Sequence, residues 1–302
     1  MSAFPLACTI RALFSASLLA LTGFAATPVL AQSCDRSCMS GLLSTYIDAL
    51  VAHDSSKLPL TANYRYTQDS QPVKLGEGLW QSVTSKTTFR HDYLDTTKHV
   101  AATHVALMEG ETTLLYSLLL HLDGSKIAGI ESLVQRVNAN SRLRPTELGK
   151  PVRGLNDPVP AGKQNTRREM IDIALTYPEG LRIGSFIDGQ TPFAEETYRV
   201  ENGAIMAGEG CGRGDCGMYA QNIIVHPGII ASVAAVDEES GVVLLWMNFG
   251  HTGDSYGVGN SLITFEAFKV WGGQIHAVNA FFVGLPISTS RFWPSEDPVY
   301  RK

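Results

Sequence analysis

Residues 192–203, "PFAEETYRVENG", read like a rewritten copy of residues 59–70, "PLTANYRYTQDS". A helical pattern precedes each stretch, and glycine-punctuated strands follow it. The spacing of matching positions grows slowly along the chain, because the second copy has extra glycine-rich loops. The spacing is 131 residues from Tyr46 to Tyr177, 133 from Pro59 to Pro192 and 148 from Ile127 to Ile275. The chain is therefore interpreted as a tandem duplication of one unit.

Each copy begins with the pattern of an amphipathic helix. From Asp35 to near His53, apolar residues recur with the i, i+3, i+4 spacing of one helix face. In the second copy, "TRRE" has the form of a capping box, in which Thr166 accepts from an early backbone N–H and Glu169 reaches back. Pro178 is expected to break or kink this second helix. The apolar positions of the first helix are Met39, Leu42, Leu43, Tyr46, Ile47, Leu50 and Val51.

Apolar and alternating stretches after each helix predict β-strands. They cover residues 99–110 and 112–136 in the first copy, and 229–250 and 261–284 in the second. Turn sequences "LDGS" and "WGGQ" occupy matching places. Between the copies, residues 138–164 contain four prolines and no apolar periodicity, which predicts a linker.

A helix, then an "ANYRYTQD" strand, then a meander in a unit of this size resembles the NTF2-like, or SnoaL-like, superfamily. The resemblance implies an α+β fold of two tandem NTF2-like cone-shaped domains, each a curved antiparallel sheet around a long N-terminal helix with a pocket inside. The domains would cover 34–137 and 165–286, followed by a C-terminal tail, 287–302. Single domains of this superfamily often pair sheet against sheet. A tandem chain is therefore expected to be a monomer with an internal pseudo-dimer.

The N-terminal sequence predicts export. Arg11 precedes an apolar stretch, and Val29-Leu30-Ala31 suits signal peptidase, so residues 1–31 are expected to be a signal peptide. A membrane anchor is the alternative, but polar residues interrupt the apolar run. The mature protein is expected to be secreted or periplasmic, where disulfides form.

Four cysteines remain once Cys8 leaves with the signal peptide, and four allow three pairings. Local pairs are expected, Cys34 with Cys38 and Cys211 with Cys216, because each closes a short loop. A zinc site is the alternative. However, the sequence has no C-x-x-C pair and no histidines clustered beside these cysteines, so no metal is expected.

Composition and missing motifs exclude several classes of function. The net charge of −5 and the absence of Lys/Arg runs argue against nucleic acid and, after signal cleavage, against a membrane partner. The sequence has no phosphate-binding glycine loop. We expect no cofactor, and a small-molecule substrate or ligand as the partner.

Ketosteroid isomerases of this superfamily place a Tyr on the first helix, an acid near the end of the next strand and a second acid on a late strand. Resemblance to that pattern points to Tyr177, Glu201 and Glu266, with Glu201 24 residues after Tyr177. Glu266 shares a strand face with Phe268, whereas Lys269 lies on the other face. The alternation permits an inward, desolvated acid. The alternative is that all three residues are structural.

Further candidates surround this trio. His276 stands where the first copy has Ala128, which makes it a candidate alternate base, with a plain structural role as the alternative. In the first half, Leu118 and Leu120 occupy the place of the late acid, so a pocket there would be apolar. Candidate ligand contacts are Tyr46, Tyr64, Tyr66 and Trp80 in the first half and Asn202, Trp246 and Phe268 in the second; core packing is the alternative for the aromatic residues.

Two functional hypotheses remain. The first is an exported, cofactor-independent acid–base enzyme, an isomerase, dehydratase or cyclase acting on a small, largely apolar carbonyl, enol or epoxide compound. In it, Glu201 accepts a proton, Tyr177 and Glu266 are donors on the oxygen side, and His276 is an alternate base. The second is a non-catalytic secreted small-molecule-binding protein. Catalysis requires an acid or His and an oxygen donor at one cavity, whereas binding requires only shape and an apolar lining.

Overall fold

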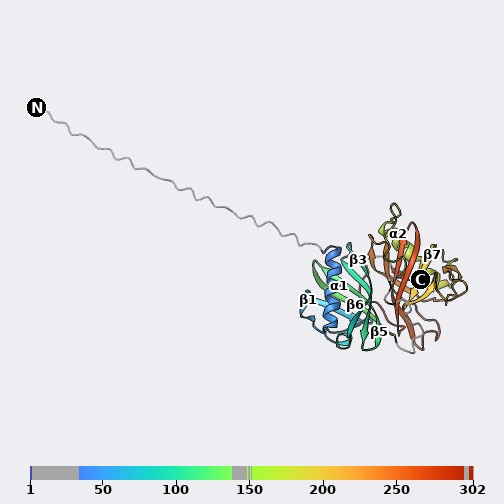
Figure 1. Ribbon diagram of the computed structural model, residues 1–302, viewed down its shortest axis with the longest axis horizontal. Coiled ribbons are helices and arrows are strands. Elements are labelled where there is room, and N and C mark those ends of the chain that lie inside the picture. Colours follow the sequence, from blue (N-terminus) through green and yellow to red (C-terminus); the bar gives the residue numbers. More distant parts are fainter. Residues whose placement is uncertain (2–33, 138–147, 149, 151, 296–298, 302) are drawn as a thin grey trace. The chain divides into compact units, whose positions relative to one another are not determined.

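The computed structural model describes Met1 and residues 34–137, 148, 150, 152–295 and 299–301 (Figure 1). Apart from Met1, the predicted signal peptide lies outside the described residues, as do Cys8 and residues 138–147 of the predicted linker. Within the described part of the chain, no helix is long and apolar enough to cross a membrane.

The first half consists of one helix and a six-stranded sheet with the order β2-β1-β6-β5-β4-β3. Its elements are α1 (Arg36–Val51), η1 (Ser55–Lys57), β1 (Leu60–Gln68), β2 (Gln71–Pro72), η2 (Gly78–Gln81), β3 (Ser85–Asp95), β4 (Val100–Glu109), β5 (Thr112–Asp123) and β6 (Lys126–Val137). Asp35 caps α1, because its carboxylate accepts from the Cys38 backbone N–H at 2.8 Å. The helix thus begins and ends where the apolar periodicity predicts.

The second half repeats this plan with a divided helix and a seven-stranded sheet, β13-β9-β10-β11-β12-β7-β8. Its elements are α2 (Arg167–Ala174), α3 (Thr176–Ile183), β7 (Phe193–Glu201), β8 (Ala204–Ala207), η3 (Met218–Ala220), β9 (Ile230–Asp237), β10 (Val242–Asn248), β11 (Asn260–Trp271), β12 (Gln274–Pro286) and β13 (Val299–Arg301). The capping box of Thr166 and Glu169 is present. The helix divides at Leu175, not at Pro178, which lies in the first turn of α3, where proline is tolerated.

Neither sheet is wholly antiparallel, which corrects the prediction. The strand after the helix runs parallel to the last strand of the meander, so β1 pairs with β6 and β7 pairs with β12. Both parallel pairs shift register at corresponding places, between Leu60 and Arg65 in β1 and between Phe193 and Tyr198 in β7. A bulge kept at the same position in both halves supports the duplication.

The sequence pattern does not predict β3, because charged residues interrupt its apolar positions. In the structure Phe89, His91 and Tyr93 are buried, whereas the intervening Arg90 and Asp92 form an ion pair at 2.7 Å. The strand therefore alternates normally, but one of its buried positions is a histidine.

Three apolar clusters hold the layers together. One lies between α1 and the first sheet, a second between the two sheets, and a third between α2, α3 and the second sheet. Because side chains alternate along a strand, consecutive residues belong to different clusters: Leu118 faces α1, whereas Leu119 faces the other sheet. The two halves thus pack sheet against sheet.

Both predicted disulfides are present. Cys34 and Cys38 are linked across the first turn of α1, and Cys211 and Cys216 close a loop between β8 and η3. Each bridge joins residues four or five positions apart, so both restrain local loops and neither links the two halves.

The C-terminal tail binds to both halves. Arg291 makes two hydrogen bonds of 2.8 Å to Glu131 in the first sheet and a third, of 3.0 Å, to the Val233 carbonyl in the second. Trp293 stacks on His121 with ring centroids 4.2 Å apart. The tail therefore contributes to the contact between the sheets.

Two corresponding ion pairs clasp the halves together. Arg36, at the start of α1, binds Asp237 at the end of β9, with its closest contact at 2.7 Å. Arg167, at the start of α2, binds Asp95 at the end of β3 at 2.9 Å. Each carboxylate also accepts a backbone N–H from the opposite half: Asp237 from Leu94 at 2.9 Å and Asp95 from Val236 at 2.8 Å. The clasp is therefore reciprocal.

We predict that Asp237→Ala lowers the free energy of unfolding by about 3 kcal/mol, because it removes the buried carboxylate partner of Arg36 and leaves the Leu94 N–H without its acceptor. Asp95→Ala should cost a similar amount. Glu239→Ala is the matched control, since Glu239 binds the same Arg36 but is 75% exposed, and its removal should cost less than about 1 kcal/mol. Urea denaturation measures all three. Equal effects for Asp237 and Glu239 would contradict the clasp.

Candidate functional site

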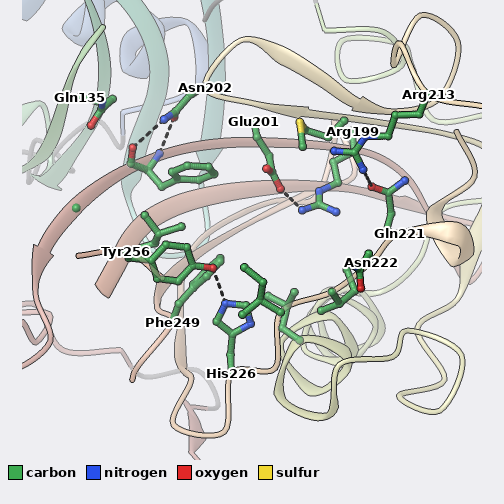
Figure 2. A pocket seen from close by; sticks show the side chains of 17 residues that line it. Gln135, Arg199, Glu201, Asn202, Arg213, Gln221, Asn222, His226, Phe249 and Tyr256 are labelled. Carbon is green, nitrogen blue, oxygen red and sulfur yellow. Dashed lines mark hydrogen bonds and ion pairs between the residues drawn. The ribbon is translucent and has the colours of Figure 1, made fainter. Parts of the chain in front are cut away.

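The second half contains a cavity of about 330 Å³ between the end of β7, β8 and the loops that precede β9 and β11 (Figure 2). Apolar and hydrogen-bonded polar side chains share its lining, and Gln135 at the end of β6 is contributed by the first half. The lining residues are Gln135, Leu181, Arg199, Glu201, Asn202, Met206, Arg213, Gln221, Asn222, Ile223, Ile224, His226, Phe249, Tyr256, Leu262, Phe282 and Gly284.

Arg199 and Glu201 form an ion pair on the cavity wall. They lie two residues apart on β7, so the strand presents both on one face. Arg199 donates to Oε1 of Glu201, and the two side chains are only 10% and 13% exposed. Figure 2 shows both pointing toward the cavity. The wall therefore carries a positive and a negative group in direct contact.

A second acid lies behind this pair. Glu266 of β11 is 1% exposed, and its Oε1 has no hydrogen-bond partner within the described part of the chain. Burial raises the pKa of Glu266 to about 7, although the charge of Arg199 and the Tyr177 hydroxyl act to lower it. The acid is therefore poised near neutral pH.

Tyr177 of α3 completes the buried cluster. Burial raises the pKa of its hydroxyl well above the usual value, although the nearby charge of Arg199 acts to lower it. The Arg199 guanidinium lies 5.9 Å from the centre of the Tyr177 ring. Since neither Tyr177 nor Glu266 lines the cavity, Arg199 connects this cluster to it.

A histidine–tyrosine pair lines another part of the cavity (Figure 2). His226 Nε2 lies 2.7 Å from the Tyr256 hydroxyl oxygen. Burial lowers the pKa of His226 to about 4, and the positive charge of Arg199 lowers it further, against the effect of the Leu181 and Ile224 backbone. The imidazole is therefore neutral at pH 7 and can exchange a proton with a hydroxyl.

The structure brings together most of the predicted catalytic residues but not His276. Tyr177 and Glu266 interact directly, and Glu201 joins them through Arg199. His276 lies outside the lining, with Nδ1 2.6 Å from Glu196 Oε1 and Nε2 3.1 Å from the Trp271 carbonyl oxygen. Because both ring nitrogens have partners, His276 has the surroundings of a structural histidine.

The predicted ligand contacts of the second half occupy three different environments. Asn202 lines the cavity, but its amide binds the Phe282 backbone N–H and carbonyl at 2.9 and 3.0 Å, so it fixes the end of β7. Trp246 packs between the sheets, whereas Phe268 packs on the helix side with Tyr177. Neither Trp246 nor Phe268 lines the cavity.

The predicted ligand contacts of the first half surround α1. Tyr46, Tyr66 and Trp80 are buried, and Tyr64 is partly buried against the same cluster. Trp80 Nε1 donates to the Tyr46 hydroxyl at 3.3 Å. These side chains have the contacts of core residues, and the described cavity of the second half is not lined by any of them.

Sequence reasoning does not single out Arg199, His226 or Tyr256. A signal for Arg199 is present, because it stands two residues before Glu201 in "YRVE" and so shares its strand face. His226 and Tyr256 belong to loops without periodicity, so only the fold reveals that they meet. No group of three or more His, Cys, Asp or Glu suited to a metal occurs among the described residues.

Comparison with known proteins finds a sequence match on this half. Residues 163–282 match a family model described as "Domain of unknown function (DUF8021)". No curated protein matches the chain. Similar solved structures include a steroid delta-isomerase from Pseudomonas aeruginosa, at 13% identity and TM-score 0.27, covering 34% of this chain and 84% of that one. A Kribbella flavida protein assigned as a ketosteroid isomerase has the same identity and TM-score, covering 36% and 85%.

We predict that one buried carboxyl titrates near pH 7 and that Glu266→Gln removes this titration. Burial disfavours the ionised form, so Glu266 should keep its proton well above the pH at which exposed glutamates lose theirs. Infrared difference spectra of the carboxylic C=O band across pH 4 to 9 measure it directly. Glu195→Gln, at an exposed position on β7, is the control. If the C=O band of the wild type is already lost by about pH 5 as the pH is raised, the prediction is wrong.

Proposed function

We propose that this protein is an exported, cofactor-independent acid–base enzyme whose site is the cavity of the second half. Its substrate is a small, largely apolar carbonyl, enol or epoxide compound, which it isomerises, dehydrates or cyclises. The observation that carries the proposal is the Arg199–Glu201 pair on the cavity wall, backed by buried Glu266 with a pKa of about 7. The two disulfides and the predicted signal peptide support export.

Glu201 is the proton acceptor in this proposal, because it is the only carboxylate among the lining residues described. The Tyr256 hydroxyl, held by His226, is a donor to a substrate oxygen from another part of the same cavity. A neutral histidine is suited to this position, since it can hold the hydroxyl without adding charge. Apolar lining side chains such as Phe249 and Phe282 exclude water from the reacting group.

Tyr177 and Glu266 are positioning residues in this proposal, since they act through Arg199. When Glu266 is protonated, the Arg199 charge is directed to Glu201; when Glu266 is ionised, the two acids share one guanidinium. Ionisation of Glu266 therefore changes how strongly Glu201 holds a proton. The predicted consequence is an activity profile with a transition near pH 7.

The alternative function is non-catalytic binding of a small molecule outside the cytoplasm. It is favoured by the direct Arg199–Glu201 contact, because Arg199 occupies the carboxylate that would act as the base. We also propose that the protein works as a monomer, because the sheet faces that superfamily dimers use are covered within one chain. Light scattering of the mature protein measures its molar mass and so tests whether it is a monomer.

The test is incubation of the mature, disulfide-intact protein in D₂O with cyclic enones, β-hydroxy ketones and epoxides, followed by mass spectrometry. Dehydration removes water and epoxide opening adds it, whereas isomerisation and cyclisation keep the composition and are recognised by a changed chromatographic retention time, with deuterium incorporated wherever the moved proton exchanges with the solvent. Glu201→Gln should abolish turnover, because the base is lost. A retained ligand with no change in mass or chromatographic retention time would favour the binding alternative.

We predict that Glu266→Gln lowers kcat about tenfold or more and removes the pH 7 transition, whereas KM changes little. Tyr177→Phe should lower kcat less and shift the transition, because it removes a hydrogen bond to Glu266. Glu195→Gln is again the matched control. An unchanged pH profile in Glu266→Gln would remove that residue from the mechanism.

A further inference from the structure

We propose that Arg213 binds an anionic group of the ligand, so that the cavity selects apolar compounds carrying one negative charge, such as a carboxylate, sulfonate or enolate. The inference rests on the proposed function in its choice of cavity and adds the ligand's charge. Arg213 lines the cavity and comes from the disulfide-closed loop between β8 and η3, which brings a guanidinium to the side of an otherwise electroneutral chamber.

The charged lining residues carry one more positive than negative charge. Arg199 and Glu201 neutralise each other, and His226 is neutral at pH 7. Arg213 has no acidic partner among the residues that the structure describes; its Nη1 donates at 3.2 Å to the amide oxygen of Gln221. One positive charge therefore remains unmatched, and a guanidinium suits a planar two-oxygen anion.

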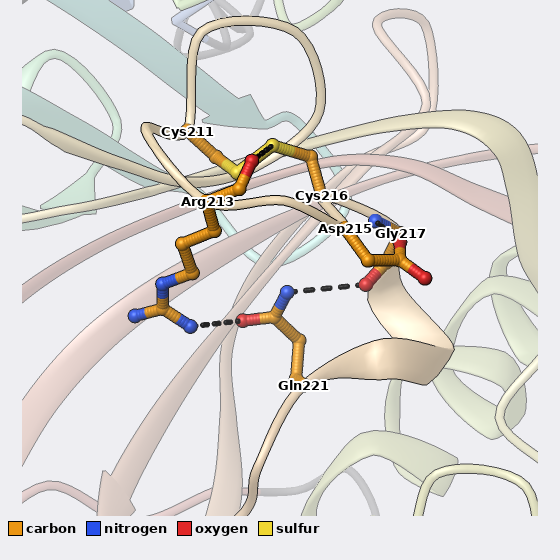
Figure 3. The surroundings of a disulfide bond; sticks show 6 residues. All are labelled: Cys211, Arg213, Asp215, Cys216, Gly217 and Gln221. Atoms are coloured by element: carbon orange, nitrogen blue, oxygen red, sulfur yellow. Dashed lines mark hydrogen bonds between the residues drawn. A yellow bond between two sulfur atoms is a disulfide. The ribbon is translucent and has the colours of Figure 1, made fainter.

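The loop holds Arg213 by several contacts rather than leaving it free (Figure 3). The Cys211–Cys216 disulfide closes it on both sides of Arg213, and the Cys216 sulfur, which carries no hydrogen, lies 3.7 Å from the Arg213 carbonyl oxygen. Gly208 donates its backbone N–H to the Cys216 carbonyl at 2.8 Å. The arginine is therefore presented on a closed ring of backbone.

Glycine at position 208 seats this ring against β7. Its φ of +86° is left-handed, and an added Cβ would lie 2.7 Å from the Tyr198 ring and 3.1 Å from the Thr197 carbonyl oxygen. Only glycine allows the loop to approach the strand that carries Arg199 and Glu201. The anion site and the proposed base are thus fixed to the same strand.

Gln221 links Arg213 to the rest of the cavity. Its side-chain nitrogen donates to the Gly217 carbonyl at 3.1 Å while its oxygen accepts from Arg213, and Gln221 itself lines the cavity (Figure 3). The amide orients the guanidinium and does not neutralise it. An anion can therefore replace or share the Gln221 contact without breaking an ion pair.

The test compares two fluorescent probes of one skeleton, 8-anilinonaphthalene-1-sulfonate and N-phenyl-1-naphthylamine, which differ by the sulfonate. Wild-type protein should bind the anionic probe about tenfold or more tightly than the neutral one. Arg213→Gln should remove that preference by weakening the anionic probe alone. Arg168→Gln, an exposed arginine of α2 outside the cavity, should leave both affinities unchanged. Equal loss of both probes in Arg213→Gln, or no preference in the wild type, would overturn the proposal.

Two further variants locate the binding and test the loop. Met206→Trp fills the cavity and should weaken both probes; unchanged binding would place the probes elsewhere and overturn the proposal. Cys211→Ser with Cys216→Ser should reduce the charge preference while circular dichroism stays unchanged, because the ring no longer fixes Arg213. Charge preference without any turnover would refute only the proposed chemistry, and turnover without charge preference would refute only the role of Arg213.

Discussion

The reciprocal Asp–Arg clasp is the constraint on which the rest of the structure depends. Asp95 and Asp237 are buried, so each needs both a guanidinium and a backbone N–H to offset the loss of water. Each obtains a guanidinium and one backbone N–H from the other half, beside a second N–H from its own half, of Ser240 to Asp237 and of Lys98 to Asp95. Because Arg36 and Arg167 also begin their helices, the same contacts tie the start of each helix to the sheet of the other half. The contribution of Gln135 to the cavity of the second half depends on this contact between the halves.

The two copies differ at the strand positions that carry the charged side chains of the second half. The strand registers equate Tyr66 with Arg199, and Leu118 with Glu266. In the first half the Tyr46 hydroxyl contacts that of Tyr116 at 3.4 Å, so neutral hydroxyls satisfy one another around α1. At the positions of Tyr66 and Leu118 the second half holds Arg199 and Glu266. A copy that keeps a neutral core serves as the partner surface, while the other carries the charges.

Elements with strong periodicity can be predicted from the sequence, whereas features that depend on tertiary contacts cannot. The helix from Arg36, the capping box at Thr166 and both hairpins follow from local rules, and the inward placement of Glu266 follows from strand alternation. The parallel pairing of β1 with β6 and of β7 with β12 does not follow from local rules, because strand direction depends on where the helix returns the chain. His226 meets Tyr256 only through two long loops, which carry no local signal. Arg199 was within reach of the alternation argument, since it shares its face with Glu201.

Two buried groups, Glu266 and His226, have pKa values shifted in opposite directions, and both shifts favour the neutral form. Glu266 has a folded pKa of about 7 against 4.5, so stability is lost as pH rises through that interval, by about 3 kcal/mol in all. His226 has a folded pKa of about 4 against 6.5, so stability is lost as pH falls through that interval, by a similar amount. Between pH 4.5 and 6.5 the two slopes cancel, and both groups stay neutral. Among the described lining residues, the charged groups are then the Arg199–Glu201 pair and Arg213. In the proposed site, the charge of the ligand therefore decides how tightly it binds.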